Sequence, residues 1–105
     1  MKLGLVIASH GRPDILQQVL MNLVSQPRLP DVIVVSAVDP ADIPQISASI
    51  VNVRTIFGDA GLTCQRNRGM SYLIDTTDVI VFIDDDFLVG DDYFLNLERI
   101  FERDR

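Results

Sequence analysis

Three adjacent carboxylates, Asp84, Asp85 and Asp86, follow directly on the apolar run 79–83. If the backbone stays extended there, Asp84 and Asp86 point to one side of the chain and Asp85 points to the other. Two carboxylates on one side favour a divalent cation, and oxygen ligands select Mg²⁺ or Mn²⁺. Such an ion would bridge the protein and a diphosphate and would neutralise a leaving group. The alternative is a solvated acidic loop that caps the last helix, but the position of the cluster at the end of a strand favours the metal site.

Short apolar runs alternate with helical patterns along the chain. The continuous apolar run 3–8 predicts a strand that is buried on both faces. Pro13 suits the first turn of the helix that follows, because its missing N–H costs nothing there. The remaining patterns predict strands at 32–38, 51–57 and 78–83, and helices at about 43–50, at 62–76 and from 91 onward.

The spacing of apolar residues predicts which side chains of these helices face the core. Asp91 and Asp92 open the last helix, where acidic residues are favourable for the helix dipole. The expected inward residues are Ile15, Leu16, Val19, Leu20, Leu23 and Val24 of the first helix, Ile43, Ile46 and Ile50 of the second, Met70, Leu73 and Ile74 of the third, and Tyr93, Phe94, Leu97, Ile100 and Phe101 of the last.

The alternation of strands and helices predicts an α/β fold. Its sheet should be mostly parallel, with about four strands and with helices on both faces. Right-handed crossovers then place every strand-to-helix loop at the same edge of the sheet. Ligands of open parallel sheets bind beyond the carboxyl ends of the strands, where the strand order reverses. The loops expected to meet there are 9–12, 36–39, 57–61 and 84–87.

Composition narrows the class of partner. The 105 residues are enough for one domain, and 48% of them are hydrophobic. The net charge of −6 and the lack of a basic stripe argue against nucleic acid as a partner. The single cysteine, Cys64, forms no internal disulfide and fits a reducing compartment, so a cytoplasmic location is expected. The N-terminal apolar run is interpreted as a strand rather than a signal peptide, and no run is long enough to imply a membrane span.

Three segments resemble motifs of the family 2 glycosyltransferases, which share the GT-A fold. Residues 79–86 (VIVFIDDD) look like the strand and DxD motif of that family. Residues 5–13 (LVIASHGRP) resemble its opening strand and turn, which commonly reads Thr-Tyr-Asn-Arg-Pro, and residues 61–69 (GLTCQRNRG) resemble its Gly-rich approach to an Ala-Arg-Asn-x-Gly helix start. The resemblance implies that residues 1–105 form a single Rossmann-like domain, the nucleotide-diphospho-sugar-binding half of a GT-A fold.

The resemblance also implies roles for the acidic triplet and for one arginine. Asp84 would contact the ribose or a metal-bound water, and Asp86 would ligate the metal that holds the diphosphate of the donor. Asp85 lies between them, and its role in binding is open. Arg66 would contact the nucleotide, although an arginine at a helix start is also a common surface residue.

The first turn offers three more candidates for contact with the nucleotide. His10 falls where the family often has a tyrosine stacked on the base, and an imidazole can stack with less area. Arg12 could reach a phosphate, and Ser9 could present its hydroxyl group or its backbone to the base. The alternatives are an exposed turn residue for His10, a surface position for Arg12, and capping or turn chemistry for Ser9.

The sequence departs from the family pattern at two of these loops. The family usually shows an Asp after the second strand, whereas Ser36 and Ala37 stand there in this chain and the first acid is Asp39. Asp39 could bind the base or ribose through a longer loop, or it could begin the turn with Pro40. Gly11 replaces the usual Asn of the first turn, so the specificity for the base is open.

The general base of the reaction is expected outside this chain. In the family, an acceptor-binding half follows and supplies an acidic residue that deprotonates the acceptor hydroxyl. No residue here fits that role unless Asp91 or Asp92 is recruited. The sequence therefore predicts donor binding without an acceptor site, and a missing C-terminal acceptor domain, a partner chain or a homo-oligomer is expected.

Three functions compete on these grounds. The leading hypothesis is the donor-binding domain of an inverting glycosyltransferase, which takes a nucleotide-diphosphate sugar with Mg²⁺ or Mn²⁺. The second is a truncated or degenerate module of the same fold that only binds nucleotide or only oligomerises. A phosphotransferase with Asp84 as nucleophile ranks lowest, because such enzymes place the nucleophile on the first strand and use a downstream lysine, whereas the only lysine here is Lys2.

Overall fold

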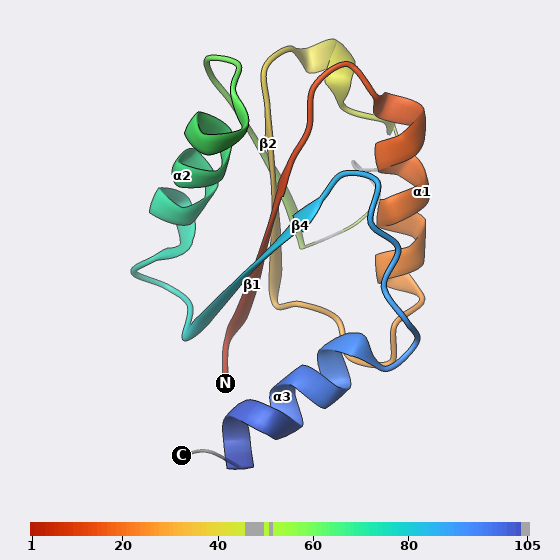
Figure 1. The fold of residues 1–105 in the computed structure, drawn as a ribbon, viewed down its shortest axis with the longest axis vertical. Helices are drawn as coiled ribbons and strands as arrows, with labels where there is room; N and C mark the ends of the chain where they lie inside the picture. The colour runs from red at the N-terminus through yellow and green to blue at the C-terminus, as the bar shows by residue number, and fades with distance from the viewer. Residues whose placement is uncertain (46–49, 51, 104–105) are drawn as a thin grey trace.

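The computed structural model describes residues 1–45, 50 and 52–103. Strands and α-helices alternate along the chain, and one short 3₁₀ turn, η1, lies between the second and third strands (Figure 1). The elements are β1 (Leu3–Ala8), α1 (Pro13–Val24), β2 (Val32–Ala37), η1 (Pro40–Asp42), β3 (Val53–Phe57), α2 (Leu62–Leu73), β4 (Val79–Asp84) and α3 (Tyr93–Arg103).

The four strands form one sheet in the order β3-β2-β1-β4, and every pair of neighbours is parallel. In the register of the sheet, Val6 of β1 lies between Val34 of β2 and Phe82 of β4. All six residues of β1 are buried, which is why its sequence is apolar without alternation. The predicted fold class is therefore confirmed as a Rossmann-like α/β fold.

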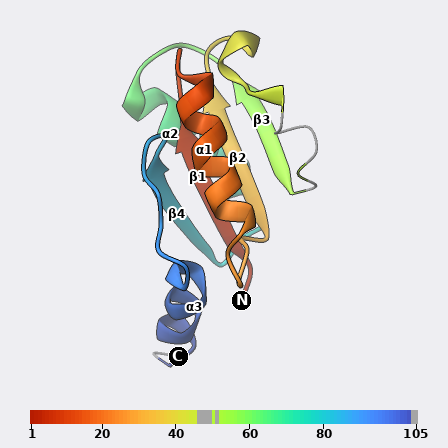
Figure 2. The ribbon, with the colours of Figure 1, turned by 90° about the vertical axis from the view of Figure 1, so that its right-hand side faces the viewer.

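Helices cover both faces of the sheet, as the sequence predicts (Figures 1 and 2). On one face α1 buries Leu16, Val19, Leu20 and Leu23 against the side chains of the three strands β1, β2 and β4. On the other face α2 brings Leu73 against Val6 and Val34. Ile15 and Val24, which were expected to face inward, lie at the edge of the stripe on α1 and are 36% and 43% exposed.

A glycine sets the distance between α2 and the sheet. Gly69 is buried, and a Cβ atom added to it would lie 2.5 Å from a methyl group of Val6. Real Cβ atoms do not approach a neighbour so closely, and Val6 cannot move away because it is enclosed in the central strand. The glycine therefore allows α2 to lie directly on β1.

β4 is less buried than its apolar sequence alone would indicate. It is an edge strand, and Phe82 is 40% exposed. α2 also ends earlier than predicted, because the carbonyl of Leu73 accepts hydrogen bonds from the backbone N–H groups of Thr76 and Thr77 and closes a turn. Ile74 lies within this turn and is 57% exposed, so its predicted inward position is wrong.

Of the helix predicted around Ile43, Ile46 and Ile50, residues 46–49 lie outside the described residues; η1 ends just before this segment, and Ile43 is extended. The third strand begins at Val53 rather than at position 51, which also lies outside the described residues.

The last helix is attached to the domain through a few specific contacts. Phe94 is fully buried, and Arg28 forms an ion pair of 2.8 Å with Glu98. Ahead of α3, the side chain of Asn22 exchanges two hydrogen bonds with the backbone of Val89. The remaining apolar face is more exposed than predicted, at Tyr93, Ile100 and Phe101, because α3 projects beyond the sheet (Figure 1). In the described ranges no helix has both the length and the apolar character needed to cross a bilayer.

Replacing Gln26 with methionine should stabilise the domain. Gln26 is 5% exposed, and among the described residues neither its amide nitrogen nor its amide oxygen has a hydrogen-bond partner. A buried unpaired amide costs about 1–3 kcal/mol, whereas methionine has a similar length and no such cost. We expect the free energy of unfolding in urea to rise by about 1 kcal/mol. The control Gln17→Met, at an exposed position, should change the free energy of unfolding by less than about 0.5 kcal/mol. A stability of Gln26→Met equal to or below that of the wild type would contradict the prediction.

Candidate functional site

A cavity of about 310 Å³ opens at the carboxyl ends of β1 and β4. The chain runs from β1 to β2 and β3 on one side and returns to β4 on the other, so the strand order reverses at this point. Open parallel sheets bind their ligands at such a place, and the volume lies at the lower end of the range for small-molecule sites. This β1–β4 cavity is lined by Ala8, Ser9, His10, Arg12, Leu62, Gln65, Asp84, Asp85 and Asp86.

The acidic triplet has two exposed side chains and one buried side chain, although β4 ends at Asp84 and the backbone is not extended over all three residues. The side chains of Asp84 and Asp86 are 61% and 57% exposed, whereas that of Asp85 is 5% exposed. A backbone hydrogen bond of 3.1 Å from Phe87 to the carbonyl of Asp84 turns the chain immediately after the strand. Two of the three carboxylates thus face the open part of the β1–β4 cavity, and the third faces the protein.

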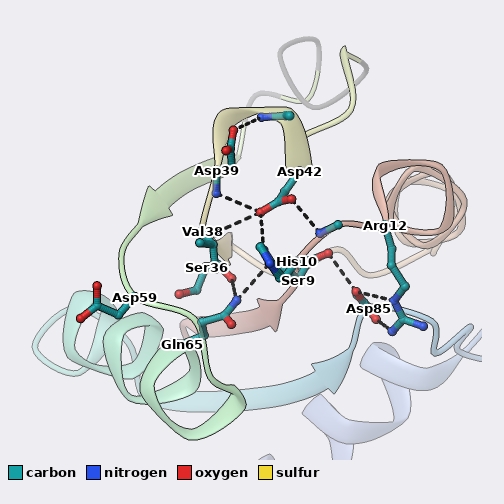
Figure 3. Close-up of polar contacts among 12 residues, drawn as sticks. Ser9, His10, Arg12, Ser36, Val38, Asp39, Asp42, Asp59, Gln65 and Asp85 are labelled. Carbon is teal, nitrogen blue, oxygen red and sulfur yellow. Dashed lines mark hydrogen bonds and ion pairs between the residues drawn. The ribbon is translucent and has the colours of Figure 1, made fainter.

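Asp85 joins the end of β4 to the loop after β1 (Figure 3). Its carboxylate accepts hydrogen bonds from the hydroxyl of Ser9 at 2.9 Å and from Nε of Arg12 at 3.2 Å, and a second guanidinium nitrogen of Arg12 contacts its other oxygen. The hydrogen bond and charge of Asp85, helped by Asp86 and Asp84, raise the pKa of Arg12 above its ordinary value. With both oxygens occupied, Asp85 holds Ser9 and Arg12 in place and is poorly available to a metal.

Each exposed carboxylate has an arginine beside it. Arg66 of α2 donates a hydrogen bond of 2.9 Å to Asp84, and a guanidinium nitrogen of Arg12 lies 3.8 Å from Asp86. The structure therefore brings the helix start and the first turn to the acidic triplet. In the part of the chain that the structure describes, no group of three or more His, Cys, Asp or Glu side chains is close enough to hold a metal. A cation here would have two carboxylates from the protein and would need further oxygen ligands.

Asp42 organises the loops after β1 and β2, a role that the sequence pattern did not indicate. Its buried carboxylate accepts backbone hydrogen bonds from Gly11 at 2.7 Å, Val38 at 3.1 Å and Asp39 at 2.9 Å, and it lies 3.2 Å from Nδ1 of His10 (Figure 3). Burial alone would raise the pKa of Asp42, but these donors outweigh it and lower the pKa from 3.8 to about 2. A hint in the sequence is the pair of acids three residues apart, 39 and 42, which forms a capping box around Pro40.

The predicted nucleotide contact Asp39 lies apart from the β1–β4 cavity lining. Its side chain accepts a hydrogen bond of 3.0 Å from the backbone of Ala41 and caps η1. Of the two interpretations that the sequence left open for Asp39, the geometry favours the turn.

Gln65 is a second residue that the sequence analysis passed over. Its buried amide donates to the backbone carbonyls of Ser9 at 2.9 Å and Ser36 at 2.8 Å, and its oxygen accepts from Gly61 (Figure 3). The start of α2 is thereby tied to the ends of β1 and β2. The spacing of Gln65, Gly69 and Leu73 by four residues marks one inward stripe of the helix and could have revealed it.

The lowered pKa of Asp42 predicts a specific acid sensitivity. Because the carboxyl group has a pKa of about 2 in the folded chain and 3.8 as its ordinary value, its ionised form stabilises the fold above about pH 4. That stabilisation is lost as the pH falls through about 2. After allowance for solvent screening it amounts to about 1–2 kcal/mol. Urea unfolding of Asp42→Asn should show this deficit at neutral pH and a shrinking deficit toward pH 2.

A matched control for this prediction is Asp59→Asn, which removes an exposed carboxylate of the next loop. It should follow the wild-type stability within about 0.5 kcal/mol at every pH. A deficit of Asp42→Asn that stays constant from neutral pH to pH 2 would show that the charge of Asp42 contributes nothing.

The sequence has no match among protein-family models and no significant match among curated proteins. The fold and the β1–β4 cavity are therefore the basis for any statement about function.

Proposed function

We propose that this domain binds a nucleotide-diphosphate sugar together with Mg²⁺ or Mn²⁺, as the donor-binding part of a GT-A glycosyltransferase of the family 2 type. One observation carries the proposal: Asp84 and Asp86 face the β1–β4 cavity at the point where the strand order reverses, and Arg66 and Arg12 lie beside them. Oxygen donors for a cation and guanidinium groups for phosphates are thus available within one small cavity.

The donor set fits the proposed cation. Asp84 and Asp86 offer carboxylate oxygens, which Mg²⁺ and Mn²⁺ prefer, and both side chains are more than half exposed and accessible to an ion. Two protein carboxylates completed by phosphate oxygens are a usual arrangement for Mg²⁺ in nucleotide sites. The cation would neutralise the diphosphate that departs when the sugar is transferred.

Two arginines supply the local positive charge that an acidic protein needs in order to bind a diphosphate. With a net charge of −6, the protein as a whole repels a diphosphate. Arg66 and Arg12 place positive charge next to the acidic pair. The guanidinium fork of Arg12 already holds Asp85, so Arg12 contributes charge and Arg66 is the candidate for direct contact with a phosphate. In this proposal Ser9 and His10 meet the nucleoside, and the general base comes from an acceptor-binding part outside these residues.

The proposal is tested by thermal unfolding of the domain with UDP, dTDP, GDP, CDP and ADP, each with Mn²⁺ and with EDTA. We expect the unfolding temperature to rise only when nucleotide and metal are both present, because the cation links the diphosphate to the carboxylates. A ligand that binds the folded state and not the unfolded state stabilises the fold by about 2.7 kcal/mol at a hundred times its dissociation constant. Mn²⁺ alone and nucleotide alone are the controls. No shift with any nucleotide and metal would overturn the proposal.

A second candidate is a non-catalytic module of the same fold that oligomerises. Exposed apolar side chains at the edge strand and near α3 favour it, namely Phe82, Phe87, Leu88, Ile100 and Phe101. Sedimentation would then show a concentration-dependent dimer whose stability is the same in Asp86→Asn as in the wild type. A monomer at all concentrations would exclude this candidate.

A further inference from the structure

The only histidine of the chain is held by a buried carboxylate. Nδ1 of His10 lies 3.2 Å from Oδ2 of Asp42, and the same carboxylate receives the backbone N–H groups of Gly11, Val38 and Asp39. Asp42 is 3% exposed, and its hydrogen bonds come from two different loops, so its position is fixed from several sides. His10 is therefore presented by the protein on a rigid support.

This arrangement determines which ring nitrogen of His10 carries the proton. A carboxylate can only accept hydrogen bonds, so Nδ1 must be the N–H donor toward Asp42. In the neutral ring Nε2 then carries the lone pair and is an acceptor. Within the described ranges the hydrogen bonds of His10 involve Nδ1 alone, its side chain is 55% exposed, and it lines the β1–β4 cavity. A ligand in the cavity therefore meets an imidazole acceptor.

Neither Asp42 nor Asp39 can accept a hydrogen bond from a ligand in the cavity in place of His10. Asp42 is buried and its oxygens already accept hydrogen bonds, and Asp39 caps η1 outside the cavity lining. Asp84 and Asp86 lie at the end of the neighbouring strand β4, where the diphosphate and the cation belong in the proposed function. Ala8 and Leu62 add apolar lining to the cavity, which suits a flat base.

We propose that His10 selects the nucleobase by accepting a hydrogen bond from its ring N–H through Nε2, and that Asp42 is the positioning residue that fixes this tautomer. The ligand class is a nucleoside diphosphate whose base carries a ring N–H next to a carbonyl group, as uracil, thymine and guanine do and as cytosine and adenine do not. This inference rests on the proposed function, because it assumes that a nucleotide occupies the β1–β4 cavity.

The tautomer can be measured without any ligand. Because the chain has one histidine, a long-range ¹H–¹⁵N spectrum contains a single imidazole, recorded at about pH 8.5, well above the pKa of a free imidazole. We expect Nδ1 to be the protonated nitrogen in the wild type. In Asp42→Asn the form protonated at Nε2, which free imidazoles of histidine prefer, should increase. A wild-type ring protonated mainly at Nε2 would overturn the inference.

Nucleotide binding tests the second part of the proposal, the hydrogen bond from the base to Nε2 of His10. Calorimetry with Mn²⁺ compares UDP with UDP methylated at N3, and GDP with GDP methylated at N1, so that the ring N–H is replaced by N–CH₃. We expect methylation to weaken binding to the wild type about tenfold, which is the effect of one lost hydrogen bond at a paired acceptor. His10→Phe keeps a flat ring and removes the acceptor, so it should bind the parent nucleotide about tenfold more weakly and should discriminate less against the methylated one.

The outcomes separate this inference from the proposed function. If UDP or GDP binds with Mn²⁺ but His10→Phe retains wild-type affinity, the ring only stacks, and the inference fails while the proposed function stands. If CDP or ADP binds more tightly than UDP or GDP, the inference about His10 likewise fails while the proposed function stands. If no nucleotide binds at all, both fail.

Discussion

Exchanging Asp84 and Asp86 together for asparagine should reduce the affinity for UDP in the presence of Mn²⁺ by about a hundredfold. Asparagine keeps the size and one oxygen of each side chain but removes the charge that attracts a divalent cation. Both side chains are more than half exposed and face the β1–β4 cavity, so the fold itself should tolerate the change. The measurement is calorimetric titration with UDP in Mn²⁺ and, separately, in EDTA, where the two proteins should differ little.

The matched control removes two acids that lie close by in sequence but outside the cavity lining. Asp91→Asn with Asp92→Asn changes the net charge by the same amount at the start of α3. It should leave metal-dependent binding within about twofold of the wild type, because exposed charges at a distance are screened by salt. If both double variants lose affinity equally, the effect comes from net charge, and Asp84 and Asp86 do not form a metal site.

Replacing Gly69 with alanine should cost about 2–3 kcal/mol of the free energy of unfolding. The added Cβ would lie 2.5 Å from a methyl group of Val6, and the crowded atom belongs to the central strand rather than to a flexible chain end. Overpacking of this kind typically costs about 1–3 kcal/mol, and it outweighs the gain of up to about 1 kcal/mol in helix propensity. Urea unfolding monitored by circular dichroism measures the change, which would be a large fraction of the stability of so small a domain.

Two further variants test whether crowding against Val6 causes the loss of stability in Gly69→Ala. A Cβ added at Gly90 meets nothing within 4 Å, so Gly90→Ala should stay within about 0.5 kcal/mol of the wild type. Truncating Val6 to alanine creates space for the new methyl group, so the two changes combined should cost less than the sum of the single changes. Wild-type stability of Gly69→Ala would show that α2 can move away from β1 at little cost.

The sequence predicted most of the framework. The uninterrupted apolar run at β1 and Pro13 at the start of α1 are short-range signals: β1 has the predicted bounds, and α1 begins at Pro13 as predicted. The division of the acidic triplet was not readable in this way: Asp85 is buried between the exposed Asp84 and Asp86, but the chain turns after Asp84 and is not extended there. The parallel sheet then placed the loops after the strands at a common edge.

Other features depend on contacts that no local pattern contains. Asp42 receives the N–H of Gly11 across 31 residues, and Gln65 reaches the carbonyl of Ser9 across 56 residues. The exposure of β4 was missed for a related reason: an apolar sequence is the same for a strand at the centre of a sheet and for one at its edge. The early end of α2 follows from a turn at Leu73 that competes with the helical pattern.

The α/β framework, the order of its elements and the identity of the charged groups at one edge of the sheet follow from the amino-acid sequence alone. How those groups pair follows from the folded chain: Asp85 holds Ser9 and Arg12, Asp42 holds His10, and Asp84 and Asp86 stay exposed at the cavity beside arginines. Periodicity specifies a local backbone and a buried face, whereas the partner of a carboxylate depends on which distant donor the packed sheet brings within hydrogen-bond distance.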